Sequence, residues 1–251
     1  MRTPHDIPTP ASALTDDALG RWLAEETLRL CAIPSVTGAE GPIADDIEAR
    51  CAALRGVRVR RVGNAIIADG PRRQGRPLIA LCGHSDTVRP AAHQRLEVGE
   101  SSDGRVYGCG ASDMKGGLAV MLALLAEAPT LAADLRCVFY DREEGPADES
   151  GVLPLCQEGD PTFRGVDLAL CLEPTDNRVE GGCLGGLHAR VVVGGQRAHS
   201  ARPWQGDNAI YRALPLLSRL AAVPRVERIV DGLTFFEVLT VTQASTDNSR
   251  N

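Results

Sequence analysis

Four short apolar runs, each ending in polar or glycine-rich residues, most strongly constrain what this chain of 251 residues can fold into. The runs lie at residues 57–68, 78–81, 135–140 and 166–172. Runs of this length are typical of strands that are buried on both faces. Apolar residues at helical spacing accompany them at residues 16–30, 43–54 and 115–128. Because strands alternate with helices, we predict an α/β domain with a mostly parallel sheet.

The pattern changes near Gly181, where several glycines precede an alternating segment. Alternation at residues 187–193 predicts a strand with one exposed face, and residues 208–222 have helical spacing before a further strand at residues 233–241. We therefore predict a first domain over residues 1–182 and a smaller α+β domain over residues 183–251, with both domains incomplete.

Composition excludes several classes of protein. The net charge is −6 and aromatic residues make up 4% of the chain, so the basic surface and stacking platforms of a nucleic-acid binder are missing. The longest run without charge covers residues 116–126, which is shorter than the ~20 residues of a membrane span. No signal peptide is visible, and the eight cysteines form no CxxC pair. We interpret the cysteines as small buried hydrophobes and expect a cytoplasmic protein.

His84 and Asp86 directly follow one of the predicted strands. In extended backbone, residues two apart face the same way, so the two side chains would share a side. A metal-binding histidine commonly has a carboxylate partner on its other ring nitrogen. The alternative is an ordinary polar loop at the end of a strand.

Asp113 lies immediately before a predicted helix, in the segment GCGASDMKGG. It could cap that helix or bind a metal ion. The segment does not match a phosphate-binding loop, because an aspartate stands where the third glycine of G-x-G-x-x-G belongs.

Acidic residues follow two more strands: Glu143 and Glu144 after one, and Glu173 after the other. Taken singly, such residues are most often solvated loop carboxylates. Together with His84 they gather at the carboxyl ends of three strands, where α/β sheets bind ligands. One histidine with several carboxylates suits Zn²⁺ or a similar ion. Two ions would need a bridging carboxylate, for which Asp113 is the candidate, and a carboxylate that is not a ligand could act as general base.

The segments GHSDTV, GCGASDMKGG, REEG, LEPT and RAHSARPW occur in this order between residues 83 and 204. Their order and spacing resemble the M20 family of zinc amidohydrolases, and within it the actinobacterial branch that desuccinylates N-succinyl-diaminopimelate. The resemblance covers roughly residues 19–241. The resemblance implies hydrolysis of the amide bond of a small N-acyl amino acid, with a role in lysine biosynthesis. Acetylornithine deacetylase, aminoacylase and carboxypeptidase activities are related alternatives.

The same resemblance implies a role for each candidate residue. His84 and Glu173 would bind one metal ion, and Glu144 would bind a second ion. Asp113 would bridge the two ions, and its peptide bond to Met114 would be cis. The ions implied are two Zn²⁺ or Co²⁺.

Three further residues would take part without binding metal. Glu143 would be the general base that deprotonates the attacking water, and Asp86 would orient His84. His199 would reach into the partner's site of a homodimer formed through residues 183–251. The other histidines, at positions 5, 93 and 188, have structural interpretations.

The family pattern includes a histidine ligand for the second ion near the C-terminus, and no histidine follows His199. The resemblance also fades after Val241. We therefore expect a C-terminally truncated copy, and a non-catalytic remnant is the alternative to an active hydrolase.

Overall fold

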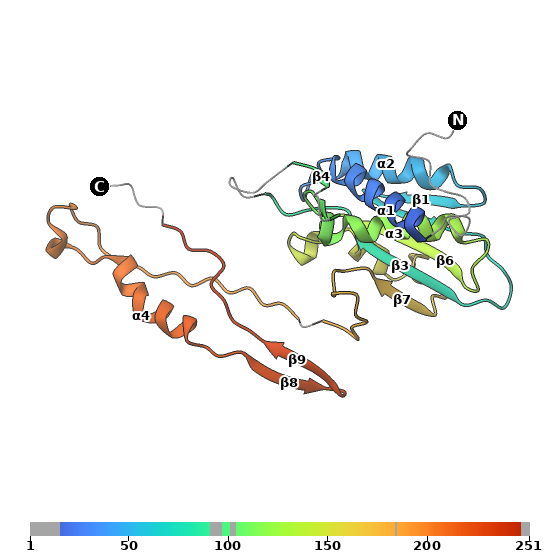
Figure 1. The fold of residues 1–251 in the computed structure, drawn as a ribbon. Helices are drawn as coiled ribbons and strands as arrows, with labels where there is room; N and C mark the ends of the chain where they lie inside the picture. Colours follow the sequence, from blue (N-terminus) through green and yellow to red (C-terminus); the bar gives the residue numbers. More distant parts are fainter. Residues whose placement is uncertain (1–15, 91–96, 101–103, 184, 247–251) are drawn as a thin grey trace. The chain divides into compact units, whose positions relative to one another are not determined.

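The computed structural model describes residues 16–90, 97–100, 104–183 and 185–246. They belong to two compact units, residues 1–177 and 178–251, which are described separately below (Figure 1). His5 and His93 lie outside the described residues. None of the described helices combines the length and apolar character needed to cross a bilayer.

The first unit is built on a five-stranded sheet. Its strands are β1 (Arg58–Val62), β2 (Ala65–Asp69), β3 (Leu78–His84), β6 (Asp134–Tyr140) and β7 (Leu168–Cys171). They lie in the order β1-β2-β6-β3-β7. β3 pairs in parallel with both β6 and β7, while β2 pairs antiparallel with β1 and β6. Four strands therefore run in one direction, which confirms the predicted α/β fold with a mostly parallel sheet.

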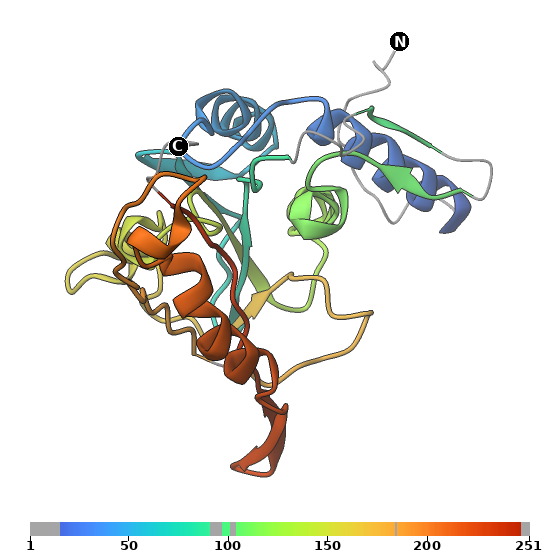
Figure 2. The same cartoon turned by 90° about the vertical axis from the view of Figure 1, so that its left-hand side faces the viewer.

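Helices α2 (Gly41–Ala52) and α3 (Gly116–Glu127) pack on one face of this sheet, and α1 (Asp16–Cys31) packs against α3. Figure 2 views the strands nearly edge-on, with α3 beside that face. The opposite face packs against Leu155 and Phe163 from the loops after β6, which contain short 3₁₀ turns at Ala147–Glu149 and Leu153–Cys156. Strands β4 (Gly99–Glu100) and β5 (Val106–Tyr107) pair with each other as a separate ribbon.

One predicted strand is two strands. Residues 57–68 form the hairpin of β1 and β2, in which Val62 pairs with Ala65 across a two-residue turn. The first turn residue is Gly63, with φ of 61°. Glycine adopts positive φ without steric cost, and two-residue turns require it at such positions. Gly63 and Asn64 interrupt the apolar residues here, and such a pair between two apolar runs is a hairpin signal that the prediction of a single strand did not use.

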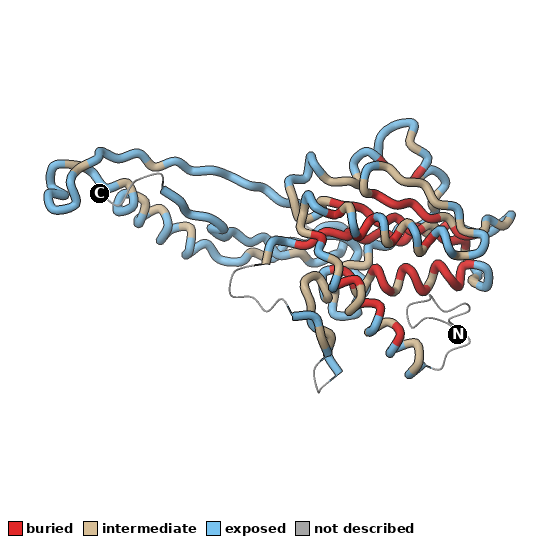
Figure 3. Tube along the Cα trace, turned by 90° about the horizontal axis from the view of Figure 1, so that it is seen from above, coloured by how far each residue is buried: buried red, intermediate tan, exposed pale blue. Residues whose placement is uncertain are grey.

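The second unit contains α4 (Ala209–Ala221) and a hairpin of β8 (Val226–Val230) and β9 (Leu233–Glu237), with a 3₁₀ turn at Pro203–Gln205. Asn208 caps α4 by accepting a hydrogen bond from the Ile210 amide at 2.9 Å. The helix was predicted, whereas β8 was not. None of the described residues of the second unit is buried, in contrast to the sheet and helices of the first unit (Figure 3).

The strand predicted at residues 187–193 is absent from the structure, where this segment is exposed and irregular. Leu187 is 92% exposed and Val192 is 84% exposed. Alternation of apolar and polar residues indicates which side chains could share a face, but a strand also needs a neighbour that accepts its backbone hydrogen bonds. No described segment pairs with these residues.

The cysteine interpretation is only half right. Cys31, Cys51, Cys82 and Cys137 are buried, but Cys156, Cys171 and Cys183 are exposed. All eight thiols are free. The exposed group comes from loops, the edge strand β7 and the second unit, which are places that composition does not identify.

Candidate metal centre

His84 is the last residue of β3, and its side chain is 1% exposed. Its Nδ1 atom lies 3.1 Å from the backbone oxygen of Asp86 and 3.4 Å from Oδ1 of the same residue. A proton on Nδ1 is therefore directed at Asp86, which turns Nε2 toward the other carboxylates. Nε2 lies 3.0 Å from Oδ1 of Asp113 and 3.8 Å from Oε2 of Glu173.

Asp86 is fully buried and joins two strand ends. Its Oδ1 accepts the amide of Glu143 at 2.9 Å, and its Oδ2 accepts the amide of Glu144 at 3.1 Å. Burial alone raises the pKa of Asp86, but its hydrogen bonds to His84, to these amides and to Thr37 hold that pKa below the usual range. The ionised carboxylate thus orients the histidine and also holds the loop that carries both glutamates.

Thr37 was not singled out by sequence reasoning. It lies between α1 and α2, and its hydroxyl donates to Oδ2 of Asp86 at 2.9 Å. Its amide donates to the backbone oxygen of Thr87 at 3.1 Å, which fixes the two loops side by side. Threonine in a loop has no pattern that marks this role, because the partner lies 49 residues away.

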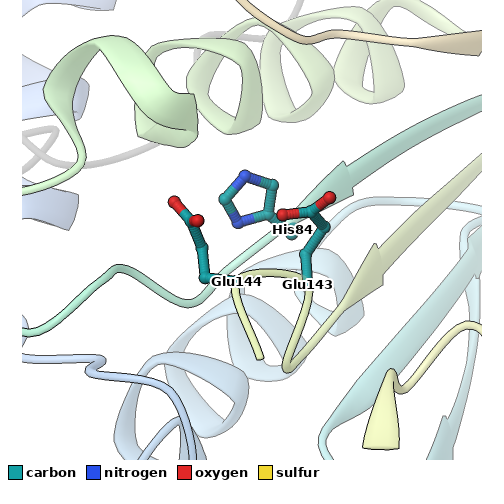
Figure 4. Close-up of side chains that lie close together, drawn as sticks. All are labelled: His84, Glu143 and Glu144. Carbon is teal, nitrogen blue, oxygen red and sulfur yellow. The ribbon is translucent and has the colours of Figure 1, made fainter. Parts of the chain in front are cut away.

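Glu143 and Glu144 follow β6 through Arg142, which has a positive φ of 57°. Figure 4 shows their carboxylates on either side of the His84 imidazole. One ligand atom from each of these three residues lies within 4.8 Å of the others. The Glu143 side chain has no hydrogen bond or ion pair to any described residue and is exposed, whereas that of Glu144 is half-buried.

Asp113 and Glu173 form a second group with His84, again with ligand atoms within 4.8 Å of one another. Asp113 precedes α3 in a non-helical conformation, and its peptide bond to Met114 is cis. Its backbone does not act as a simple helix cap, and its side chain makes no capping hydrogen bond. Glu173 follows β7, so the two groups collect residues from four separate chain segments at one edge of the sheet.

Burial and neighbouring charges together set the pKa values of the site. Burial, together with the negative charges of Asp113 and Glu143, raises the pKa of Glu173 to about 7, against the opposing effect of His84. Burial also raises the pKa of Glu144. Burial by itself lowers the pKa of His84, yet its bonds to Asp86 and Asp113 and the charge of Glu173 raise that pKa to about 9.

The donor set fits a divalent ion. Imidazole nitrogen and carboxylate oxygens are ligands of Zn²⁺ and related ions, and no thiolate competes in either group. In the charged imidazolium, the Nε2 proton lies between His84 and Asp113, where a cation would replace it. His84, Asp113, Glu143, Glu144 and Glu173 are thus brought together, and their individual roles remain predictions.

His199 belongs to the second unit and is not part of these groups. It is exposed, and its Nδ1 accepts the Ala201 amide at 3.1 Å, which leaves Nε2 free of that contact.

Comparison with known proteins gives a family match over residues 80–232, to the model described as peptidase family M20/M25/M40. The chain is 43% identical over 223 residues to a succinyl-diaminopimelate desuccinylase of Corynebacterium glutamicum, covering 86% of this chain and 58% of that one. It is 40% identical to a putative succinyl-diaminopimelate desuccinylase of Mycobacterium tuberculosis, covering 88% of this chain and 61% of that one. The chain therefore spans about three fifths of the length of these relatives.

Among solved structures, the fold is similar to that of a tripeptidase from Staphylococcus aureus. The two chains are 21% identical, with a TM-score of 0.51 over 84% of this chain and 60% of the other. This likeness confirms the fold.

The hydrogen bonds of Asp86 predict the effect of Asp86→Asn. An amide side chain keeps one acceptor oxygen and presents an N–H₂ group to a backbone amide that needs an acceptor. We expect affinity for Zn²⁺ to fall ~10–100-fold, the usual cost of removing a partner that orients metal ligands. Titration against a competing chelator measures it. Thr37→Val, which leaves both amides bonded, should weaken binding less.

Thr130→Val is the matched control for the threonine variant, because its hydroxyl bonds only to Glu127 at the far end of α3. It should bind zinc as the wild type does. A folded Asp86→Asn chain with unchanged affinity would contradict the role assigned to Asp86.

The raised pKa values predict proton release on metal binding. His84, with a pKa of about 9, is protonated at neutral pH, and coordination through Nε2 removes that proton. Glu173, with a pKa of about 7, adds a second proton at lower pH. Apparent affinity should therefore rise as the pH rises to about 9. We expect release of about one proton per ion at pH 8 and closer to two at pH 6.

Calorimetric titrations in buffers with different ionisation enthalpies count these protons. Glu173→Gln should remove the extra release at pH 6. An affinity that falls between pH 6 and pH 8 would show that neither His84 nor Glu173 is a ligand.

Proposed function

The chain belongs to peptidase family M20/M25/M40, and from that premise we propose that it hydrolyses the amide bond of N-succinyl-LL-2,6-diaminopimelate. The products would be succinate and LL-diaminopimelate, a precursor in lysine biosynthesis. The proposed substrate is supported by the two relatives at 43% and 40% identity, which are named as a succinyl-diaminopimelate desuccinylase and a putative one. The observation that carries the chemistry is the pair of ligand groups around His84.

We infer two Zn²⁺ or Co²⁺ ions as cofactors. His84, Asp113 and Glu173 would hold one ion, while Asp113 and Glu144 would contribute to the other. When bound, such ions polarise a carbonyl oxygen and make water more acidic. Burial, with the negative charges of Asp113 and Glu143 added, raises the pKa of Glu173, and bound cations would offset those charges.

Glu143 is the proposed general base. Its backbone is fixed by the bond from its amide to Asp86, but its carboxylate is exposed and unpaired among the described residues. A base must reach the attacking water and take its proton, then deliver that proton to the departing amine. Glu144, whose side chain is more buried, suits metal binding better.

The test is an assay of the chain with Zn²⁺ or Co²⁺ on N-succinyl-diaminopimelate, with N-acetylornithine, an N-acetyl amino acid and a dipeptide as competing substrates. We expect the succinylated substrate to have the highest kcat/KM. Preference for another substrate would overturn the specificity, and metal binding without turnover on any of them would favour the non-catalytic alternative.

Glu143→Gln separates the base from the ligands in the same assay. It should lower kcat ~10²–10⁴-fold and leave the bound metal unchanged, because a base removes a proton without holding the ion. Glu144→Gln should instead weaken metal binding. The opposite pattern would exchange the two roles.

We also propose that the chain forms a homodimer through residues 183–251 and that His199 acts on the partner's site. Apolar side chains lie exposed along α4 at helical spacing, with Ile210 at 56% and Leu214 at 52%, and they offer a surface for a second copy. A histidine in this position could stabilise the charge that develops on the substrate oxygen.

Complementation tests the arrangement. Chains carrying His199→Ala or Glu143→Gln should each be inactive, and co-expression should restore about one quarter of the wild-type activity, since half the dimers are mixed and each has one intact site. Mixed dimers with no activity would show that His199 serves its own chain.

A further inference from the structure

Lys115 is the only lysine in a chain with 27 basic residues, so every other basic position is an arginine. It lies two residues after Asp113 and is 1% exposed. A lysine is almost never fully buried unless its ammonium has partners. Lys115 is therefore unusual both as the single lysine and as a buried one.

The partners of its ammonium are backbone oxygens at the end of α1. Nζ donates to the Leu30 oxygen at 3.2 Å and to the Ile33 oxygen at 2.9 Å, across more than 80 residues of sequence. The last carbonyls of a helix lack helical donors, and the negative end of the helix dipole favours a cation there. Lys115 therefore links the start of α3 to the end of α1.

Its neighbour Met114 is also fully buried, but in another direction. The Met114 sulfur accepts the His84 amide at 3.2 Å, and its terminal carbon lies where side-chain atoms at Gly83 or Gly117 would have to be. Two consecutive side chains thus anchor this backbone, one against β3 and the other against α1.

The Asp113 side chain is the exposed member of the three, with 51% of its surface accessible. Its carboxylate contacts Nε2 of His84 at 3.0 Å and also hydrogen-bonds with the carboxyl of Glu173. The backbone that carries this exposed side chain is held by Met114 and Lys115.

We propose that Lys115 is a positioning residue, whose ammonium ties the Asp113 segment to the end of α1 and so places the Asp113 carboxylate for metal binding. This inference rests on the proposed function, in which Asp113 is a metal ligand.

The geometry also explains why this position carries lysine in an arginine-rich chain. An ammonium is compact, has three donors and can bond two carbonyls in a closed site. A guanidinium is planar and has five donors, so the same site would leave N–H groups unbonded. We therefore expect that Lys115→Arg, although it keeps the charge, does not preserve the bonds to the two carbonyls.

Lys115→Met is the first variant to measure, because methionine fills similar space without charge or donors. We expect ~10–100-fold weaker Zn²⁺ binding in a chain with unchanged circular dichroism, as for loss of other groups that orient ligands. Lys115→Arg should be impaired as well. A folded Lys115→Met chain that binds zinc as tightly as the wild type would overturn the proposal.

Arg73→Met is the matched control. Arg73 donates to the Ala128, Pro129 and Ala133 oxygens just beyond the far end of α3, away from the candidate site, and it also pairs with the buried carboxylate of Asp134. It should lower the melting temperature and leave zinc affinity unchanged. Loss of affinity in proportion to stability in both variants would also overturn the proposal.

A measurement on the wild type applies even where Lys115→Met does not fold. Labelling with ¹⁵N-lysine gives one Nζ signal, because the chain has one lysine. If the ammonium positions a metal ligand, metal binding must strengthen its bonds in return. Saturating zinc should slow exchange of the Nζ hydrogens several-fold, and unchanged exchange would overturn the role of Lys115.

The two levels of failure are distinguishable. A wild-type chain that binds no zinc would contradict the proposed function, and the role of Lys115 with it. Tight binding by the wild type, with unchanged Nζ exchange and unchanged affinity in Lys115→Met, would contradict the role of Lys115 alone.

Discussion

The buried carboxylate of Asp86 is the interaction on which the candidate site depends. It contacts Nδ1 of His84 and accepts hydrogen bonds from the amides of Glu143 and Glu144 and from the hydroxyl of Thr37. These groups come from the end of β3, the end of β6 and the loop before α2. A buried anion with this many donors is satisfied and stays ionised, whereas an unpaired one would be costly. One side chain therefore sets the relative positions of the histidine and the acidic loop.

Around this fixed point, the site gathers more negative charge than its own cation balances. His84 is the only positively charged partner shown for Asp86, Asp113 and Glu173 among the described residues. Burial, with the charges of Asp113 and Glu143 added, raises the pKa of Glu173, and the surrounding carboxylates raise the pKa of His84. A bound cation would replace these protons and offset the negative charge of the carboxylates.

The first unit builds its own core, with helices on one face of the sheet and loops on the other, and it contains both ligand groups. The second unit differs in kind. Its secondary structure is local, a capped helix and a hairpin, and none of its described residues is buried. Helix caps and tight turns form from neighbouring residues, but burial requires apposed elements. Both candidate ligand groups therefore belong to the unit that builds its own core.

The sequence by itself determined the α/β class, α1 to α4 and the residues at the strand ends, because helical spacing, buried-strand runs and motif order are all local patterns. Only the tertiary structure decided the lack of a strand at residues 187–193, the bond from Thr37 to Asp86, and the carbonyl partners of Lys115. Each of these depends on a partner that neighbouring residues do not specify. Lys115 stands out in the sequence as the only lysine, but its partners at the end of α1 are known only from the tertiary structure.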